Sequence, residues 1–294
     1  MKKLNGIFSS VVLTSVLVLA GCSNNSGSSE AANVSSTEET TIKIGSFGSD
    51  LDIWTYISEL EATKEAGINI ELVNVDGIDI NTATSAGDMD YNAFQTYDYM
   101  KVFNDDHEED VVPAFTTYIE PLGIYSNEFD TLDDVPEASQ VAIANNPAQQ
   151  SRSLALLQDA NFITLNEEVE GLYTVKDITE SPKNLEFIEI DDNSGLQALE
   201  DVALVTISST LAFEGGLNPK EDALFTEDTS NITDSNIGNV NVFVTSDDNE
   251  NSEQIETLQE IYFSDDVKNY IETEFNDTKV PVDLDLATFE SEGE

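Results

Sequence analysis

The 294-residue sequence has very few basic residues: eleven Lys and Arg stand against 59 Asp and Glu, for a formal net charge of −48 at pH 7. A surface this negative repels the phosphates of nucleic acids and of anionic lipids, so neither is an expected partner. It also repels itself at low salt, whereas at about 1 M salt a Debye length of about 3 Å screens the repulsion. We therefore expect an acidic, halophilic surface adapted to saline surroundings.

Cysteine and histidine each occur only once, as Cys22 and His107. A single cysteine excludes a disulfide framework within the chain. The lone histidine lies in an acidic stretch that is predicted to be a loop. It can supply neither the several His of a zinc or manganese site nor a triad with a neighbouring nucleophile. The sequence also lacks an EF-hand calcium loop and a glycine-rich phosphate loop. We therefore expect no enzyme activity, no metal and no cofactor.

The apolar segment at residues 11–20 is short, well below the roughly 20 residues that a membrane-spanning helix needs. Lys2 and Lys3 precede it, and small residues lead to Gly21-Cys22, which is the pattern of a lipoprotein signal. We predict cleavage before Cys22 and lipidation of its thiol; the alternative is an ordinary signal peptide with an incidental cysteine. Two or more acyl chains would anchor the protein stably to the extracytoplasmic face of the cell membrane.

The rest of the chain divides into a tether, a folded body and a tail. Residues 23–40 are rich in Ser, Asn, Gly and Glu, with almost nothing to bury, as in a flexible tether. In the body, short β-rich runs alternate with helical periods, which predicts βαβ units, mostly parallel sheets and an α/β fold with two lobes around a ligand cleft. The expected strands lie at residues 41–45, 68–75, 141–144, 185–190, 204–207 and 239–245, and the main helices at 52–66, 147–160 and, as a pair, 253–275. The expected boundaries are 1–21 for the signal peptide, 22–40 for the lipidated cysteine and tether, 41–120 plus 240–286 for lobe 1, 121–239 for lobe 2 and 287–294 for an acidic tail.

Arg152 is the only arginine in the chain. Its guanidinium offers a planar fork of donors that matches a carboxylate and stays charged. It follows Asn146 and Pro147, which suit a helix cap and a first helical turn, so we expect it early in a helix behind the strand at 141–144. Helix N-termini and the carboxyl ends of strands are where anions and ligands bind in α/β proteins. Two roles stay open: a clamp for an anionic ligand, and a structural salt bridge to one of the many acids.

Several stretches, by their order and spacing, resemble the NlpA family of lipoproteins, the methionine-binding subunits of ABC importers. They are residues 45–50 with Ile53 and Trp54, 87–95, 117–126, 144–158, 212–218 and 264–268. The resemblance covers nearly the whole body, from Ile42 to about Val282, behind the lipoprotein signal. It implies a periplasmic-binding-protein fold with two α/β lobes, a small-molecule ligand with a free carboxylate, and delivery of that ligand to a membrane permease. We expect a monomer.

The resemblance also assigns ligand contacts. The arginine of the family's Asn-x-Pro-x-x-x-x-Arg stretch, expected to hold the ligand carboxylate, is Arg152 here. Phe94, and Trp54 with it, would give an apolar wall against which the ligand side chain is buried; the alternative for Phe94 is ordinary core. The further candidates for polar or wall contacts are Gln95, Thr96, Tyr118, Asn145, Gln149, Ser208 and Ser209. Where the family commonly has Tyr, His and two Asn, this chain has Ala93, Thr96, Gln149 and Ser208, which implies a retained amino-acid clamp with an altered side-chain pocket.

The sequence therefore predicts a lipid-anchored substrate-binding protein that delivers methionine, or a related amino acid or small peptide, to an ABC importer. Closure of the two lobes would bury the ligand, and no covalent chemistry is needed. The alternative is an adhesin-like surface protein that reuses the same fold for interaction without transport.

Overall fold

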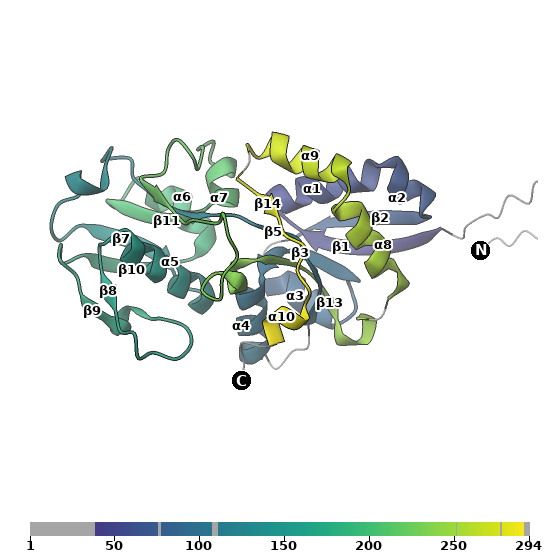
Figure 1. Ribbon diagram of the computed structural model, residues 1–294, viewed down its shortest axis with the longest axis horizontal. Coiled ribbons are helices and arrows are strands. Elements are labelled where there is room, and N and C mark those ends of the chain that lie inside the picture. Colours follow the sequence, from purple (N-terminus) through teal and green to yellow (C-terminus); the bar gives the residue numbers. More distant parts are fainter. Residues whose placement is uncertain (1–38, 76–77, 108–110, 251, 277, 291–294) are drawn as a thin grey trace, which may run out of the picture. The chain divides into compact units, whose positions relative to one another are not determined.

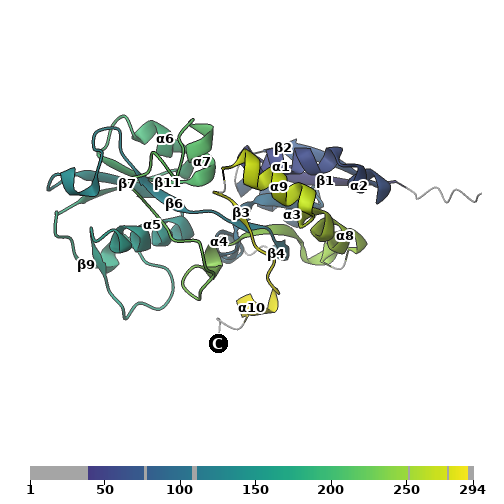
Figure 2. The same ribbon diagram turned by 45° about the horizontal axis from the view of Figure 1, so that its top comes forward.

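The computed structural model describes residues 39–75, 78–107, 111–250, 252–276 and 278–290. Cys22, the predicted signal peptide and almost all of the predicted tether lie outside these residues. The described chain forms two five-stranded sheets with helices packed on them (Figures 1 and 2). None of the helices in these ranges is both long and apolar enough to cross a membrane.

The first sheet contains both parallel and antiparallel strand pairings. The folded body begins and ends beside this sheet. Its strands are β1 (Thr40–Ser46), β2 (Ile68–Asn74), β3 (Tyr91–Thr96), β4 (Val111–Thr116) and β13 (Asn241–Ser246). Their order across the sheet is β2-β1-β3-β13-β4. β1 pairs in parallel with β2 and β3, whereas β13 runs antiparallel to both β3 and β4.

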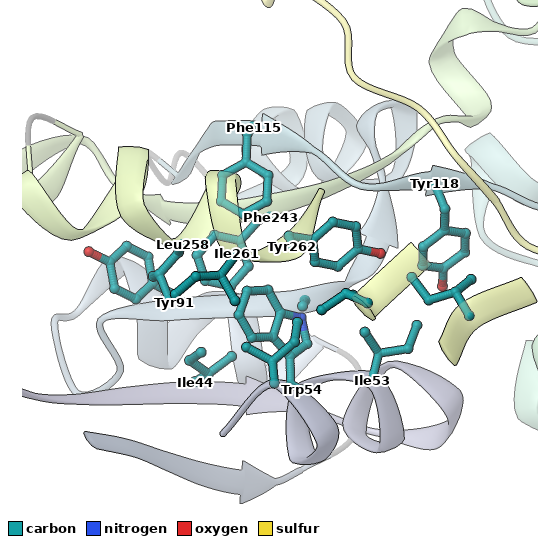
Figure 3. Packing of buried hydrophobic residues seen from close by; sticks show 14 of the residues in the cluster. Ile44, Ile53, Trp54, Tyr91, Phe115, Tyr118, Phe243, Leu258, Ile261 and Tyr262 are labelled. Carbon is teal, nitrogen blue, oxygen red and sulfur yellow. The ribbon is translucent and has the colours of Figure 1, made fainter. Parts of the chain in front are cut away.

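Helices cover both faces of this sheet because their apolar residues recur on one side. The helices are α1 (Gly48–Glu59), α2 (Glu61–Glu65), α3 (Ile78–Ser85), α4 (Tyr97–His107), α8 (Glu253–Tyr262) and α9 (Asp265–Glu274). Ile53, Trp54 and Ile57 of α1 are fully buried, and the Trp54 ring stacks on Phe243 of β13 with centroids 4.4 Å apart (Figure 3). On the other face, Phe103 of α4 belongs to a separate cluster with residues of β4 and β13. Helices on both sides bury both faces of this sheet, in which half of the strand pairings are parallel.

The second sheet has the same plan. Its strands are β6 (Leu122–Tyr125), β7 (Gln140–Ala144), β10 (Glu186–Ile190), β11 (Leu204–Ser208) and β12 (Phe225–Thr226), in the order β10-β7-β11-β6-β12. Its helices are α5 (Pro147–Asp159), α6 (Gly195–Ala198) and α7 (Ser209–Glu214), and a small hairpin, β8 (Thr164–Leu165) with β9 (Ile178–Glu180), lies beside α5. Val141 and Ile143 of β7 join the α5 cluster, whereas Ala142 between them joins the cluster of α6 and α7. This alternation shows that β7 is buried on both faces.

The chain passes between the two sheets twice. It leaves β4 through β5 (Tyr118–Ile119) to reach β6, and it returns from β12 through residues 227–240 to β13. The C-terminal β14 (Val280–Pro281) pairs antiparallel with β5. After β14, α10 (Ala287–Glu290) packs Phe289 on Tyr97 of α4, with ring centroids 4.2 Å apart. The C-terminal segment therefore runs along the first crossover.

The α/β fold agrees with the prediction, but the sheets are mixed and not mostly parallel. Each contains two parallel and two antiparallel pairings. Alternation of strands and helices could not reveal the reversals, because β13 enters the first sheet from the second and β6 enters the second from the first. His107 is the last residue of α4, with its ring stacked on Phe103 at 4.6 Å, and does not lie in a loop. The predicted acidic tail begins inside the folded body, because Phe289 of α10 is buried.

Candidate ligand-binding site

A cavity of about 350 Å³ is lined by residues from both sheets and from the first crossover. This volume lies at the lower end of the range for small-molecule pockets. Eight of the residues that the sequence analysis proposed as ligand contacts line the cavity. They are Phe94, Gln95, Thr96, Tyr118, Asn145, Gln149, Arg152 and Ser208. The structure thus brings together residues that are spread over more than a third of the chain.

Strand direction explains why these residues meet. β7, β10 and β11 run parallel, so their carboxyl ends lie at one edge of the second sheet. Asn145 follows β7, Asp191 follows β10, and Ser208 ends β11; all three line the cavity. The last residues of β3, from Phe94 to Thr96, face them from the first sheet.

Arg152 is buried and already paired. Its Nε lies 2.9 Å from Glu227 Oε1, its Nη2 also contacts Glu227, and Nη2 donates to the Glu120 carbonyl at 2.6 Å. Glu227 also accepts a hydrogen bond from the Leu122 amide at 2.9 Å. Burial alone would lower the pKa of Arg152, but the charge and hydrogen bonds of Glu227 raise it on balance. The salt-bridge role left open by the sequence is therefore real.

The same guanidinium keeps donors for a ligand. Among the described residues, Nη1 of Arg152 has no hydrogen-bond partner, and it is not sealed from the cavity. Glu227 and the Glu120 carbonyl hold one side of the planar group and leave the Nη1 side available. The two roles left open for Arg152 are compatible in this geometry.

The backbone N–H groups at the N-termini of α5 and α7 are less available to a ligand than their position beside the cavity suggests. Asn146 caps α5 and accepts hydrogen bonds from the amides of Ala148 at 3.0 Å and Gln149 at 3.2 Å. Ser208 caps α7 through the Leu211 amide, and the Thr210 amide donates to Glu120. These N–H groups already have acceptors, so an anionic ligand group must be held chiefly by side chains.

A buried ionic network lies behind the cavity at the first crossover. Lys279 Nζ is 2.6 Å from Glu120 Oε2 and 2.8 Å from the Thr210 hydroxyl, and its side chain is fully buried. Lys279 also lies over the Tyr118 ring, 3.9 Å from its centroid. Thr210 is 3.0 Å from the Ser49 hydroxyl of α1. The network therefore joins α1, α7, the crossover and the C-terminal segment.

Asp50 belongs to this network and also lines the cavity. Its Oδ2 accepts a hydrogen bond from the Tyr118 hydroxyl at 2.7 Å, whereas its Oδ1 has no partner among the described residues. Burial raises the pKa of Asp50 to about 6, although Lys279 and the Tyr118 hydrogen bond oppose the rise. Tyr118 is thus engaged as a support for Asp50.

Three further candidates are tied into the protein by their own side chains. The Gln95 amide exchanges hydrogen bonds with Asn81 at 2.6 and 2.7 Å and donates to Asn92 at 2.9 Å. The Thr96 hydroxyl accepts from the Tyr99 amide at 3.2 Å, and the Ser208 hydroxyl caps α7. The Gln95 amide in particular has little capacity left for a ligand.

Aromatic rings form one wall of the cavity. Phe94 is partly buried and contacts Phe47 at 5.5 Å and Tyr99 at 5.8 Å between ring centroids. All three rings line the cavity, so Phe94 is a wall residue and not ordinary core. Trp54 is fully buried between the sheet and α8 and does not line the cavity, so the suggestion that it contacts the ligand is wrong (Figure 3). Ala93 is likewise core and outside the cavity lining.

Three amide side chains are left free to bind. Asn145 and Gln149 line the cavity, and their side chains make no hydrogen bond to other residues that the structure describes. The sequence analysis missed a third, Asn241 at the start of β13, which is 6% exposed and equally without a side-chain partner in the described ranges. An amide buried without partners indicates a position where a ligand supplies them. Ser209, also proposed, donates to the Pro121 carbonyl and lies outside the lining.

Two further carboxylates, which the sequence analysis did not single out, belong to the lining. The Asp191 side chain accepts a hydrogen bond from the Asn193 amide at 3.0 Å, whereas the Asp192 carboxylate has no hydrogen-bond partner among the described residues. Burial, reinforced by the charge of Asp191, raises the pKa of Asp192 to about 7. No group of His, Cys, Asp and Glu in the described ranges could hold a metal ion.

Comparisons with known proteins agree with this picture. The D-methionine-binding lipoprotein MetQ of Escherichia coli K12 is 34% identical over 223 residues, which span 75% of this chain and 80% of that protein. A nutrient-binding protein from Burkholderia cenocepacia, solved bound to methionine, has a TM-score of 0.76 at 29% identity and covers 82% of this chain and 99% of its own. The substrate-binding protein of a methionine transporter from Streptococcus pneumoniae has a TM-score of 0.74 at 33% identity, with 83% and 96% covered.

The likeness extends over nearly the whole folded body. The sequence pattern of the NlpA lipoprotein family matches residues 42–283, from β1 to the segment that follows β14. The two sheets with their helices accordingly form the two-lobe, periplasmic-binding-protein-like fold of the solved relatives. This chain belongs to the NlpA lipoprotein family.

Proposed function

We propose that this protein is a lipid-anchored, extracytoplasmic substrate-binding protein that delivers methionine, or a related amino acid or small peptide, to an ABC importer. The observation that carries the proposal is the cavity itself, which presents Nη1 of Arg152 beside unpartnered amides. Relatives named as methionine-binding lipoproteins support the ligand class. Lipidation of Cys22 would provide the membrane anchor.

In this proposal the ligand's carboxylate binds to Arg152. Glu227 holds the guanidinium in position, and Nη1 donates toward the carboxylate together with the amides of Gln149 and Asn241. The α-ammonium group requires acceptors, and the free Oδ1 of Asp50 is one that the cavity offers. A zwitterionic amino acid would therefore find partners for both charges.

Delivery would depend on movement about the two crossovers. Because the cavity draws its walls from both sheets, closure around a ligand would bury it, and opening would release it. A permease that binds the closed form would receive the ligand from it. No covalent step is involved, and the protein is expected to act as a monomer.

The test is calorimetric titration of the full-length protein with free L-amino acids and dipeptides, starting with L-methionine. Arg152→Lys keeps the positive charge beside Glu227 but loses the planar fork, so we expect at least a tenfold loss of affinity for the best ligand. Lys176→Gln removes an exposed cation far from the cavity lining and serves as the control. Unchanged affinity in Arg152→Lys would remove the clamp. Absence of binding across the whole panel would favour the surface-interaction alternative.

A further inference from the structure

The charges around the cavity do not balance. Its charged lining residues are Asp50, Glu120, Arg152, Asp191 and Asp192. Glu227 pairs with Arg152, and Lys279 pairs with Glu120, so the site contains five carboxylates against two cations. Asp50, Asp191 and Asp192 remain without a cation in hydrogen-bonding contact. A zwitterionic ligand brings no net charge and would leave this excess unchanged.

The unbalanced charge is concentrated where β10 ends. Asp191 and Asp192 follow one another there, and the only charged group that shifts the pKa of Asp192 is Asp191. Arg152 forms its ion pair and hydrogen bonds with Glu227 and Glu120, and makes none with these two aspartates. Tyr99 lines the same cavity as both aspartates, and burial, together with the charges of Asp192 and Asp191, raises the pKa of Tyr99 to about 12.

Aromatic side chains line the cavity together with these two carboxylates. The rings of Phe47, Phe94 and Tyr99 contact one another in that order and line the same cavity as Asp191 and Asp192. The cavity is also lined by Asn241, which is 6% exposed and whose side-chain amide has no hydrogen-bond partner among the described residues, as expected where a ligand binds. Asp191 is exposed and Asp192 is partly buried, and both line this cavity together with the aromatic rings.

A ligand side chain would meet two kinds of group along this wall, namely aromatic rings and carboxylates. Methylene groups pack well on aromatic faces, and a cation next to them gains from the rings as well as from the carboxylates. A thioether would satisfy the rings alone. Closure would then bury two adjacent carboxylates without a counter-ion, which is unfavourable unless they take up a proton.

We propose that the ligand is an amino acid whose side chain ends in a cation, as in lysine. Its methylenes pack on Phe47, Phe94 and Tyr99, and its terminal ammonium pairs with Asp191 and Asp192. The inference rests on the proposed amino-acid-binding function and narrows it, since Arg152 still holds the ligand carboxylate. It gives the altered side-chain pocket a specificity different from that for methionine.

A matched pair of ligands tests this directly on the unmodified protein. L-lysine and L-norleucine share the same four-carbon chain, and only lysine carries the terminal ammonium. Calorimetric titration of the full-length chain should give at least tenfold tighter binding of lysine than of norleucine at pH 8. If norleucine or methionine binds as tightly as lysine, the inference is overturned while the proposed function stands. If dipeptides bind but no free amino acid does, the inference is overturned and the proposed function stands; if neither free amino acids nor dipeptides bind, both fall.

Substitution of the two aspartates tests whether they cause the preference for lysine over norleucine. Asp191→Asn and Asp192→Asn together should reduce lysine affinity at least tenfold and change norleucine affinity less than threefold, so the preference disappears. Glu137→Gln, which removes an exposed carboxylate in the turn before β7 and outside the cavity lining, should leave the preference intact. If the double variant does not fold, the two single variants and the comparison of lysine with norleucine on the wild-type protein still test the inference. A preference for lysine that survives in Asp191→Asn/Asp192→Asn would place the cation elsewhere and refute the assignment.

Discussion

At the scale of single residues, Asp50 of the proposed ligand site is a carboxyl group in unfavourable surroundings. The carboxyl is 6% exposed, has one hydrogen bond from Tyr118, and is not in direct contact with Lys279, which binds Glu120 instead. Burial raises its pKa from 3.8 to about 6. A buried carboxylate that is only partly satisfied costs stability but remains free to accept a ligand's ammonium group.

The pH dependence of stability should reveal this cost. Between pH 4 and 6 the folded protein holds a proton on Asp50 that the unfolded chain has released, so the free energy of unfolding falls as pH rises through this window and stays lower above it. Asp50→Asn has no such titration and can still accept from Tyr118. We expect it to exceed the wild type in urea unfolding by up to about 3 kcal/mol at pH 7–8, and to match it below pH 4. Asp52→Asn, an exposed neighbour in α1, is the control; a gap that is independent of pH would contradict the assignment.

How far the site could be predicted also depends on single residues. Arg152 was identifiable because it is the only arginine and follows a helix cap, but its partner Glu227 lies 75 residues away and no local pattern connects the two. Gln95 and Tyr118 line the cavity as expected, yet their polar atoms are bound to Asn81 and Asp50, which only the folded structure shows. Asp191 and Asp192 were hidden by the abundance of acids, because any one acidic pair looks like all the others.

At the scale of elements, α5 shows why some predictions succeed. The helix was expected at residues 147–160 and occupies Pro147–Asp159, because its start is encoded locally by the side chain of Asn146 and the fixed φ of Pro147. Strand direction is not encoded in this way. The reversed entry of β13 between β3 and β4 depends on where the return crossover brings the chain. Local signals predicted where elements lie, and long-range connections determined how they pair.

The cap of α5 can be tested by itself. Asn146→Ala removes the acceptor for the amides of Ala148 and Gln149, so we expect a loss of about 1 kcal/mol in the free energy of unfolding, measured in urea. Asn146→Asp keeps an acceptor and adds a negative charge at the helix N-terminus, so its stability should stay within about 0.5 kcal/mol of the wild type. Equal losses in both variants would show that the cap does not stabilise α5 through these bonds.

At the scale of the whole molecule, the dominant property is the charge of −48. The two described cations that are most deeply buried, Arg152 and Lys279, are both used for internal pairs at the cavity, so they do little to offset the acids on the surface. The folded state must therefore be stable despite repulsion between surface carboxylates, which ions from the solvent screen. The same field would attract a cationic ligand toward the protein, in keeping with the charge of the cavity.

Stability should accordingly depend strongly on salt. The Debye length shortens from about 30 Å at 10 mM to about 3 Å at 1 M, and screening relieves more repulsion in the compact folded state than in the expanded unfolded chain. We expect the free energy of unfolding to rise by about 2 kcal/mol or more between 10 mM and 2 M NaCl, measured by thermal unfolding of the full-length chain. Sucrose separates screening from solute exclusion, since it stabilises folded proteins without screening charge. If the protein is equally stable at 10 mM and 2 M NaCl, or if sucrose reproduces the entire effect, the acidic surface is not what makes stability depend on salt.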